Sequence, residues 1–247
     1  MKDNEIVLLV CDCGGNNPAL IEGVAASGLD VDAYVIRDLC GAALAKSVEL
    51  SAILKSYRRQ IVLACFPRAA RALFAQCGID APSAEFINLQ DGGLASALDG
   101  ARGLGVGVGV PRVYPLDSEL SVPSWFPVID RERCTACGIC ADFCLFGVYR
   151  KFAGKKPEVQ KPLNCKNNCP ACARKCPSSA VIFPKIPERG TIAGAEVGKS
   201  RAGVPAQNEG VRPVRSSLLR PDVAAEIEQG RLRALSEKEN SEDHAHD

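Results

Sequence analysis

Eight of the thirteen cysteines in this 247-residue sequence fall in two short runs. The first run is spaced C-x2-C-x2-C-x3-C and consists of Cys134, Cys137, Cys140 and Cys144. The second run is spaced C-x3-C-x2-C-x3-C-P and consists of Cys165, Cys169, Cys172 and Cys176. Three thiolates a few residues apart can wrap one face of an iron–sulfur cube, and a distant fourth thiolate closes it. Zinc, the alternative metal, prefers two CxxC pairs in a closed tetrahedron, so the third cysteine is surplus to its geometry. The spacing therefore predicts iron–sulfur clusters.

Each run is followed by a short apolar segment, FGVYRK or AVIFPK, so the region looks like an internal pseudo-repeat. Over roughly 60 residues it resembles the bacterial dicluster ferredoxins. In two-cluster ferredoxins the fourth cysteine of each run ligates the other cluster. The resemblance implies two [4Fe-4S] clusters with these ligands: Cys134, Cys137, Cys140 and Cys176 for one; Cys165, Cys169, Cys172 and Cys144 for the other.

Three features depart from the usual dicluster pattern. Leu145 stands where proline usually follows the fourth cysteine, and the second run has one extra residue, Asn167 or Asn168. A connection of 20 residues separates Cys144 from Cys165. None of these changes removes a ligand, but we expect the longer connection to alter the surface beside one cluster.

Residues 5–103 alternate short β-branched runs with helical patterns. The predicted strands are EIVLLV, VDAYVIRD, QIVLAC and AEFINL, and the predicted helices lie at 18–26, through 42–53, after Pro67 and around 94–98. Strands spaced by helices predict right-handed crossovers and a parallel sheet. We therefore expect an α/β domain with a parallel sheet over residues 1–103, and a linker strand and loops over 104–127. A small α+β dicluster ferredoxin domain over 128–189 and a largely disordered tail over 190–247, with one helix near 221–235, complete the expected organisation.

The remaining five cysteines are Cys11, Cys13, Cys40, Cys65 and Cys77. The first four follow or end three predicted strands, whose carboxyl ends share the sheet edge where ligands of open α/β folds bind. Cys77 instead closes a helix just before Gly78, toward the opposite edge. For the converging four, the residues alone leave three uses open: a metal site, a redox dithiol, or packing as small hydrophobes.

Four segments, VCDCGGN, LC at 39–40, ACFPRAARALF and INLQ, resemble the N-terminal domain of heterodisulfide reductase A over about the first 95 residues. That family domain is associated with an iron–sulfur cluster of its own, which here would be a third cluster on Cys11, Cys13, Cys40 and Cys65. The family usually has a further cysteine after the fourth strand, where this chain has DGGLAS. No G-x-G-x-x-G lies between a strand and a helix, so we expect no flavin and no nucleotide.

Two other glycine-rich stretches and the histidines carry no catalytic signal. GLGVGVGV at 103–110 leads to Pro111 rather than to a helix, and GAEVGKS at 194–200 is one residue short of a P-loop. The only histidines, His244 and His246, lie in the terminal tail. We therefore assign no catalytic residue, and expect a non-catalytic chain more than an enzyme.

Composition narrows the cellular setting. The chain has a net charge of +1 and only 5% aromatic residues, so we expect no nucleic-acid partner. No run approaches the ~18 apolar residues of a membrane span, and the acidic N-terminal stretch with its short apolar run leads us to expect no signal peptide. Clustered cysteines without these signals predict a cytoplasmic metalloprotein. Residues 128–189 carry an excess of seven positive charges, which either compensates anionic clusters or forms a docking surface for an acidic redox partner.

Together these patterns predict a relay subunit of an anaerobic, heterodisulfide-reductase-like oxidoreductase complex. It would pass single electrons between a partner and a catalytic subunit that carries flavin or metal. The alternative is an enzyme whose Cys11/Cys13 pair reduces a disulfide substrate with electrons from the ferredoxin clusters. A third possibility is an assembly scaffold whose clusters are structural.

Overall fold

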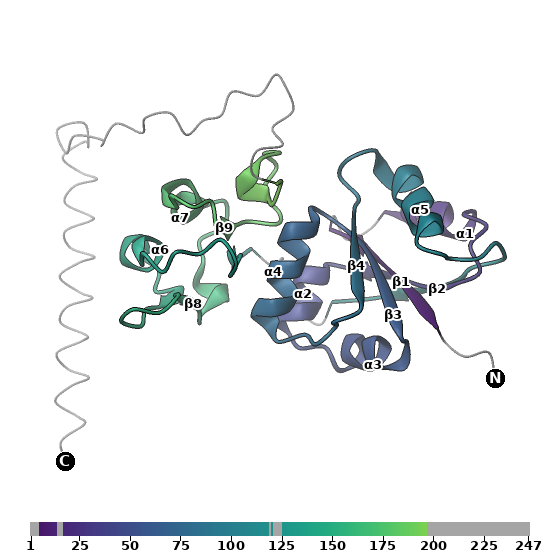
Figure 1. Ribbon diagram of the computed structural model, residues 1–247, viewed down its shortest axis with the longest axis horizontal. Coiled ribbons are helices and arrows are strands. Elements are labelled where there is room, and N and C mark those ends of the chain that lie inside the picture. Colours follow the sequence, from purple (N-terminus) through teal and green to yellow (C-terminus); the bar gives the residue numbers. More distant parts are fainter. Residues whose placement is uncertain (1–4, 14–16, 119, 121–124, 197–247) are drawn as a thin grey trace, which may run out of the picture. The chain divides into compact units, whose positions relative to one another are not determined.

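The computed structural model describes residues 5–13, 17–118, 120 and 125–196. In this part of the chain five strands form one sheet in the order β4-β3-β1-β2-β5 (Figure 1). The strands are β1 (Ile6–Asp12), β2 (Asp32–Arg37), β3 (Arg59–Ala64), β4 (Ala84–Asn88) and β5 (Arg112–Leu116). Every neighbouring pair is parallel, which confirms the predicted parallel α/β sheet.

Helices cover both faces of the sheet and give three layers (Figure 1). The helices are α1 (Pro18–Ala25), α2 (Leu39–Leu44), α3 (Val48–Ser56), α4 (Pro67–Cys77) and α5 (Gly93–Gly103). Residues of α1 and α5 join one core cluster, and residues of α2, α3 and α4 join the other. Side chains alternate along a strand, so Leu9 and Cys11 of β1 face the α2–α4 side, whereas Leu8 and Val10 face α1 and α5.

The helical pattern predicted through residues 42–53 is two helices, α2 and α3. Lys46 between them has a positive φ of 53°, which an α-helix does not accommodate. Ser47 then starts α3, because its hydroxyl accepts a hydrogen bond of 3.3 Å from the backbone N–H of Leu50. The apolar residues keep a helical spacing across this break, so the sequence pattern does not indicate where one helix ends and the next begins.

The segment 104–127, predicted as a linker strand and loops, contributes β5 to the sheet. β5 pairs with β2, Tyr114 stacks on Tyr34 with ring centroids 5.0 Å apart, and Arg112 donates to the carboxylate of Asp32. β5 is an edge strand, which tolerates Pro115 because one side of its backbone needs no ladder partner. Because glycines and prolines flank β5, the sequence pattern indicated a linker rather than a strand of the main sheet.

The cysteine-rich part is built of short elements. Its strands are β6 (Val128–Ile129), paired antiparallel with β9 (Val181–Ile182), and β7 (Tyr149–Arg150), paired antiparallel with β8 (Glu158–Val159). Its helical elements are α6 (Ile139–Phe143), α7 (Ala171–Lys175) and the 3₁₀ turns η1 (Pro162–Asn164) and η2 (Thr191–Ala193). The hairpin of β7 and β8, together with η1, lies in the 20-residue connection between the two cysteine runs.

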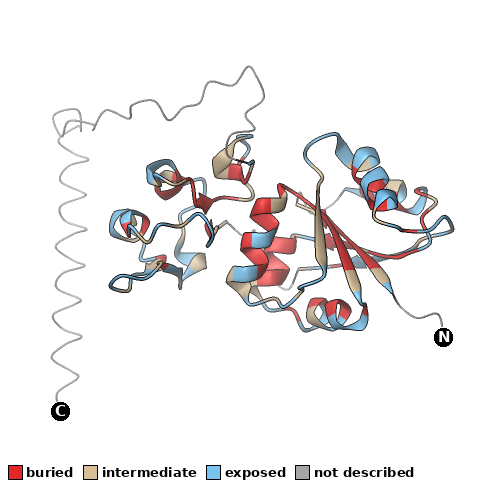
Figure 2. Cartoon of the chain, in the orientation of Figure 1, coloured by how far each residue is buried: buried red, intermediate tan, exposed pale blue. Residues whose placement is uncertain are grey.

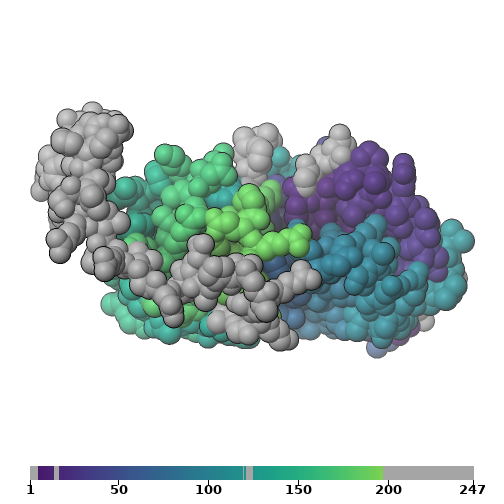
Figure 3. All heavy atoms as spheres, turned by 90° about the horizontal axis from the view of Figure 1, so that it is seen from above, coloured from purple at the N-terminus to yellow at the C-terminus, as the bar shows by residue number. Residues whose placement is uncertain are grey.

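Residues 190–196, expected to belong to the tail, are packed into the fold. Ala193 is buried, and Gly194 has a φ of +112° and lies so close to α4 that an added Cβ would be 2.6 Å from that of Ala69. Figure 3 shows the last described residues, in light green, against the blue and purple surface of the N-terminal part. The remainder of the expected tail, including the helix predicted near 221–235, lies outside the described residues. No helix in the described ranges is long and apolar enough to cross a membrane.

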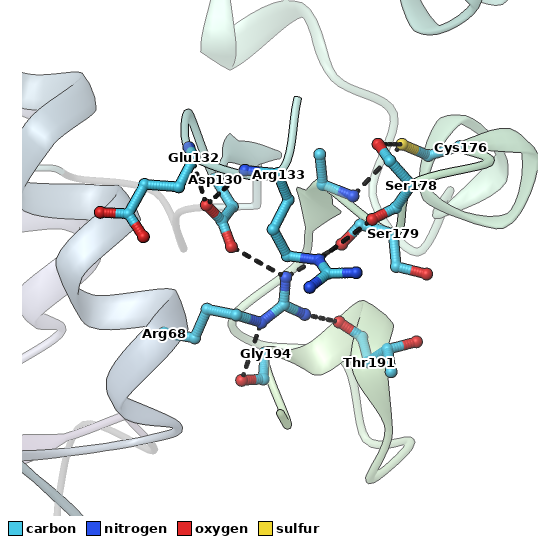
Figure 4. A network of polar contacts seen from close by, with 10 residues as sticks. Arg68, Asp130, Glu132, Arg133, Cys176, Ser178, Ser179, Thr191 and Gly194 are labelled. Carbon is cyan, nitrogen blue, oxygen red and sulfur yellow. Dashed lines mark hydrogen bonds and ion pairs between the residues drawn. The ribbon is translucent and has the colours of Figure 1, made fainter. Parts of the chain in front are cut away.

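A buried arginine, Arg68 of α4, joins the α/β part to the cysteine-rich part (Figure 4). Its side chain is 7% exposed, and Nη1 contacts Oδ2 of Asp130 at 3.2 Å and donates to the carbonyl of Ser179 at 2.9 Å. Nε donates to the carbonyl of Gly194 at 3.4 Å, and Nη2 donates to that of Thr191. One guanidinium thus satisfies acceptors from three segments of the cysteine-rich part.

A second α4 residue makes the same junction. Gln76 donates to the carbonyl of Pro127 at 3.1 Å and accepts from the N–H of Ile129 at 3.2 Å, so its amide extends the backbone pairing of β6. Figure 2 shows α4 as largely buried, which fits a helix covered by the sheet on one side and by the cysteine-rich part on the other.

We predict that Arg68→Leu lowers the free energy of unfolding by about 3–5 kcal/mol, because it leaves the Asp130 carboxylate buried without its cation. Denaturant titration followed by circular dichroism measures the change. Arg174→Leu is the matched control, since the pair of Arg174 and Glu188 is half exposed and should contribute at most about 1 kcal/mol. Equal losses in the two variants would contradict the role given to Arg68.

Candidate functional site

The loops of the two cysteine runs have matching backbone conformations. Ala136 and Asn168, which directly precede the second cysteine of each run, have positive φ angles of 61° and 60°. Such left-handed residues are uncommon outside glycine and concentrate at functional sites. The second run therefore accommodates its extra residue and still reproduces the turn of the first.

The last two cysteines of each run also occupy equivalent places. Cys140 and Cys172 are each the second residue of a short helix, α6 or α7, and both are buried. Cys144 and Cys176 each end that helix with extended backbone, at φ, ψ of −80°, 110° and −74°, 112°. The predicted pseudo-repeat is thus present in the backbone as well as in the cysteine spacing.

Thiols of the two runs lie within electrostatic reach of one another. Burial, then the thiols of Cys172, Cys169 and Cys144, raise the pKa of Cys165 to about 12. Burial, then Cys172, Cys176 and, more weakly, Cys134, raise the pKa of Cys140 to about 12. The last cysteine of each run, Cys144 or Cys176, is therefore close to thiols of the other run.

Three polar groups surround the sulfur atoms. The hydroxyl of Tyr149 donates to Sγ of Cys172 at 3.0 Å, and the backbone N–H of Ala180 donates to Sγ of Cys176 at 3.3 Å. Ser178 Oγ lies 3.6 Å from the same sulfur. Burial acts to raise the pKa of Cys176, but these hydrogen bonds outweigh it and lower the pKa. Thiolate is the form that ligates metal, so such donors suit a cluster site.

The exposure of the cysteines differs along the runs, because Cys137 is exposed whereas Cys140 and Cys172 are buried.

All thirteen cysteines are free of disulfide bonds. Within the described ranges, no three His, Cys, Asp or Glu side chains are gathered tightly enough to hold a single metal ion.

The N-terminal thiols lie at a switch point of the sheet. β1 leads to α1 on one face, whereas its neighbour β3 leads to α4 on the other, so their connections diverge. Open α/β sheets bind ligands in the crevice formed there, outside the carboxyl ends of the strands. Cys11 and Cys13 lie at the end of β1, and Cys65 directly follows β3. Cys40 is the second residue of α2, just after β2.

The four N-terminal thiols form a group. Sγ of Cys11 and Sγ of Cys13 are 3.0 Å apart. The hydrogen bond with Cys13, burial and the charges of the other three thiols raise the pKa of Cys11 well above its ordinary value. Burial, followed by Cys65 and Cys13, likewise raises the pKa of Cys40. Cys77 lies apart: burial raises its pKa to about 11, and the charged residue that acts on it is Lys46 rather than a thiol.

A lysine from the cysteine-rich part reaches this group. Lys185, three residues after β9, pairs with Asp38 at 2.7 Å, and both side chains are less than one-fifth exposed. The hydrogen bond with Cys11 lowers the pKa of Cys13, and the charge of Lys185 acts in the same direction. Cys13, Cys65 and Lys185 line a cavity of about 390 Å³, which Gln90 and Arg189 also line. The crevice of the sheet is thus completed by the cysteine-rich part.

Sequence reasoning missed four side chains at these sites: Arg68, Tyr149, Lys185 and Trp125, which stacks on Phe183 and lines a small cavity with Cys40. Arg68 and Lys185 lie inside the quoted segments ACFPRAARALF and AVIFPK, but nothing in those segments indicates their long-range partners. Tyr149 is in the apolar segment that follows the first run. Only contacts between segments far apart in the sequence give these residues their roles.

Comparison with known proteins identifies the cysteine-rich part. The 4Fe-4S binding domain family matches residues 127–147, which contain the whole first run. An uncharacterised ferredoxin of Methanocaldococcus jannaschii is 46% identical over 69 residues, 27% of this chain and 46% of the relative. A second one from the same organism is 35% identical over 61 residues, 24% of this chain and 78% of the relative. The chain belongs to the ferredoxin family.

The ferredoxin therefore binds a 4Fe-4S cluster, and its thiols fit that group. Buried cysteines, sulfur-directed N–H and O–H donors and two equivalent loops provide the ligands and hydrogen bonds that such a cluster needs. The matches extend over about a quarter of the chain, and the ferredoxin spans about half the length of the first relative.

Proposed function

We propose that this ferredoxin is an electron-relay subunit of a larger, heterodisulfide-reductase-like oxidoreductase complex of anaerobic metabolism in the cytoplasm. A 4Fe-4S cluster takes up and releases one electron at a time. The chain's own residues bury the ligands, donate hydrogen bonds to sulfur and hold the sites together. The N-terminal similarity to heterodisulfide reductase A supports the type of complex.

The observation that carries the proposal is a shared core. The buried thiols of Cys11, Cys40 and Cys65 belong to the same hydrophobic cluster as those of Cys140 and Cys172. No change of domain packing is needed to bring the two groups together, because α4, β6 and β9 already join them. A relay needs such a dry, fixed connection, since electrons must pass between sites inside one chain.

We propose two clusters in the ferredoxin part. Electrostatic contacts of Cys165 with Cys172, Cys169 and Cys144 support one ligand group. Those of Cys140 with Cys176 and Cys134 support the other, and the additional, stronger effect of Cys172 on Cys140 indicates that the two groups adjoin. Cys137, at the left-handed turn of the first run, would complete the second group. Each group takes its fourth thiolate from the other run, as the dicluster resemblance implies.

Because each proposed cluster takes one ligand from the other run, the iron lost on substituting two cysteines should depend on which two are changed. Cys144→Ser with Cys165→Ser removes two ligands of one proposed cluster, so the pair should cost about four irons per chain, no more than Cys165→Ser alone. Cys144→Ser with Cys134→Ser affects both clusters and should cost about eight. Iron and acid-labile sulfide analysis of anaerobically purified protein measures this. The reverse ranking of the two double variants would refute the crossed assignment.

We propose a third cluster on the four thiols at the switch point, Cys11, Cys13, Cys40 and Cys65. Their mutual effects on pKa and the adjacent cavity support a shared ligand. The second candidate is a redox dithiol, which the 3.0 Å separation of the Cys11 and Cys13 sulfurs favours. In that function Cys13, with its lowered pKa, would attack a disulfide substrate and Cys11 would resolve the mixed disulfide.

Iron counting separates these candidates. With a third cluster we expect about 12 irons per chain, falling by about four in Cys13→Ser. Cys77→Ser is the matched control and should leave the count unchanged, because Cys77 lies apart from the thiol group. About eight irons in the wild type, with a titratable dithiol that Cys13→Ser abolishes, would instead establish the dithiol function.

We propose an acidic redox partner for the exposed side of the ferredoxin part. Leu145, the residue in place of the usual proline, is 78% exposed and follows the first run directly. Phe143, two residues before Leu145, is also exposed, and Nζ of Lys175 lies 6.0 Å from the centroid of the Phe143 ring. An apolar centre with basic side chains around it suits a partner surface of opposite charge.

If the basic surface attracts negatively charged partners, the rate of electron transfer to a small anionic oxidant should depend on salt concentration. Oxidation of the reduced protein by anionic ferricyanide should slow several-fold as ionic strength rises from about 0.01 M to about 0.15 M, because the screening length falls from about 30 Å to about 8 Å. Lys166→Gln with Lys175→Gln should reduce this dependence, whereas Lys55→Gln on α3 should not. A rate insensitive to salt would show that the lysines only compensate cluster charge.

A further inference from the structure

The chain's single tryptophan, Trp125, has a polar atom that the protein leaves unsatisfied. The indole stacks on Phe183, with ring centroids 5.3 Å apart and an interplanar angle of 29°. Its Nε1 is fully enclosed and has no hydrogen-bond partner among the residues that the structure describes. Buried N–H groups are normally paired, so an unpaired one requires an explanation such as an absent ion or group.

The indole lies beside the second cysteine run. Trp125 and Cys165 pack against the same hydrophobic core. Burial and neighbouring thiols raise the pKa of Cys165, and the nearby indole N–H of Trp125 acts to lower it. The contact does not reach hydrogen-bond geometry with the free thiol. A sulfur atom with more negative charge at this position, as in a cluster-bound thiolate or sulfide, would accept the N–H.

Trp125 also lies near one of the N-terminal thiols, that of Cys40. Trp125 and Cys40 line the same small cavity of about 10 Å³, together with Phe183 and Lys185. A cavity of that size holds at most about one water molecule. Trp125 therefore borders a nearly closed cavity shared with Cys40 and also lies near Cys165.

We propose that Trp125 donates a hydrogen bond to cluster sulfur at Cys165 and forms the packed contact between that cluster and the thiols of the α/β domain. This inference rests on the proposed relay function and gives the order of the sites along the relay. The Cys165 group is next to the N-terminal site, and the Cys134 group, with its exposed Cys137, is the outer one. Trp125 is a positioning residue that favours reduction, since the reduced cluster carries one more negative charge than the oxidised one.

The test is a redox titration of Trp125→Phe, which keeps the ring on Phe183 and removes the N–H. We expect unchanged iron content and one midpoint potential that is more negative, by about tenfold in the equilibrium constant for reduction or about 59 mV for one electron. Tyr149→Phe, which removes the 3.0 Å donor to Cys172, should shift the same potential. Ser178→Ala, beside Cys176, should shift the other potential.

The outcomes separate this inference from the proposed function. Full iron with neither potential changed by Trp125→Phe, while Tyr149→Phe shifts one, would overturn the role of Trp125 and leave the relay intact. A shift of the potential that Ser178→Ala affects would also overturn it. Wild-type protein without iron–sulfur clusters would instead refute the relay itself.

Tryptophan emission gives a second readout if Trp125→Phe does not fold. Because the chain has one tryptophan, its fluorescence reports on this position alone. We expect emission of the wild type to be quenched while the clusters are present and to increase several-fold when iron is removed by oxidation and chelation. Emission that is the same before and after iron removal would overturn the proposal.

Discussion

The burial of one positive charge, on Arg68, determines how the two parts of this ferredoxin are joined. Desolvating a guanidinium is tolerated only with a counter-charge and enough acceptors. Asp130 supplies the charge, and carbonyls from Ser179, Thr191 and Gly194 supply the acceptors. These acceptors belong to the ferredoxin part, so α4 can bury Arg68 only when that part is folded against it. The position of the cysteine runs relative to the sheet follows from this requirement.

Two different structural principles bring the thiols together at the two ends of this contact. In the ferredoxin part, a repeated left-handed turn and a short helix present the thiols of each run. In the α/β part, a switch of crossover direction opens a crevice at β1 and β3, and thiols that follow strand ends meet there. Short spacing predicts the first arrangement and topology predicts the second, which is why the first is the firmer inference.

Local patterns in the sequence were sufficient for β1 to β4 and for recognising a 4Fe-4S ferredoxin part, because alternation and spacing are local signals. β5 was not recognised as a sheet strand, since Pro115 and neighbouring glycines are tolerated only at a sheet edge that a local pattern does not identify. The break between α2 and α3 depends on the positive φ of Lys46, a residue with no such preference. The partners of Arg68, Trp125 and Lys185 are set by tertiary packing and have no sequence signal.

Lys185 shows why the α/β part alone would not make a complete site. Ionising a thiol at this sheet edge is costly. The hydrogen bond with Cys13 and burial raise the pKa of Cys11, burial raises that of Cys40, and the charges of neighbouring thiols raise both further. Lys185 opposes this cost at Cys13 and Cys40, yet it comes from the segment after β9 and is held there by Asp38. The ferredoxin part therefore contributes charge to the N-terminal site as well as contact. The proposed relay between the two sites would use this contact.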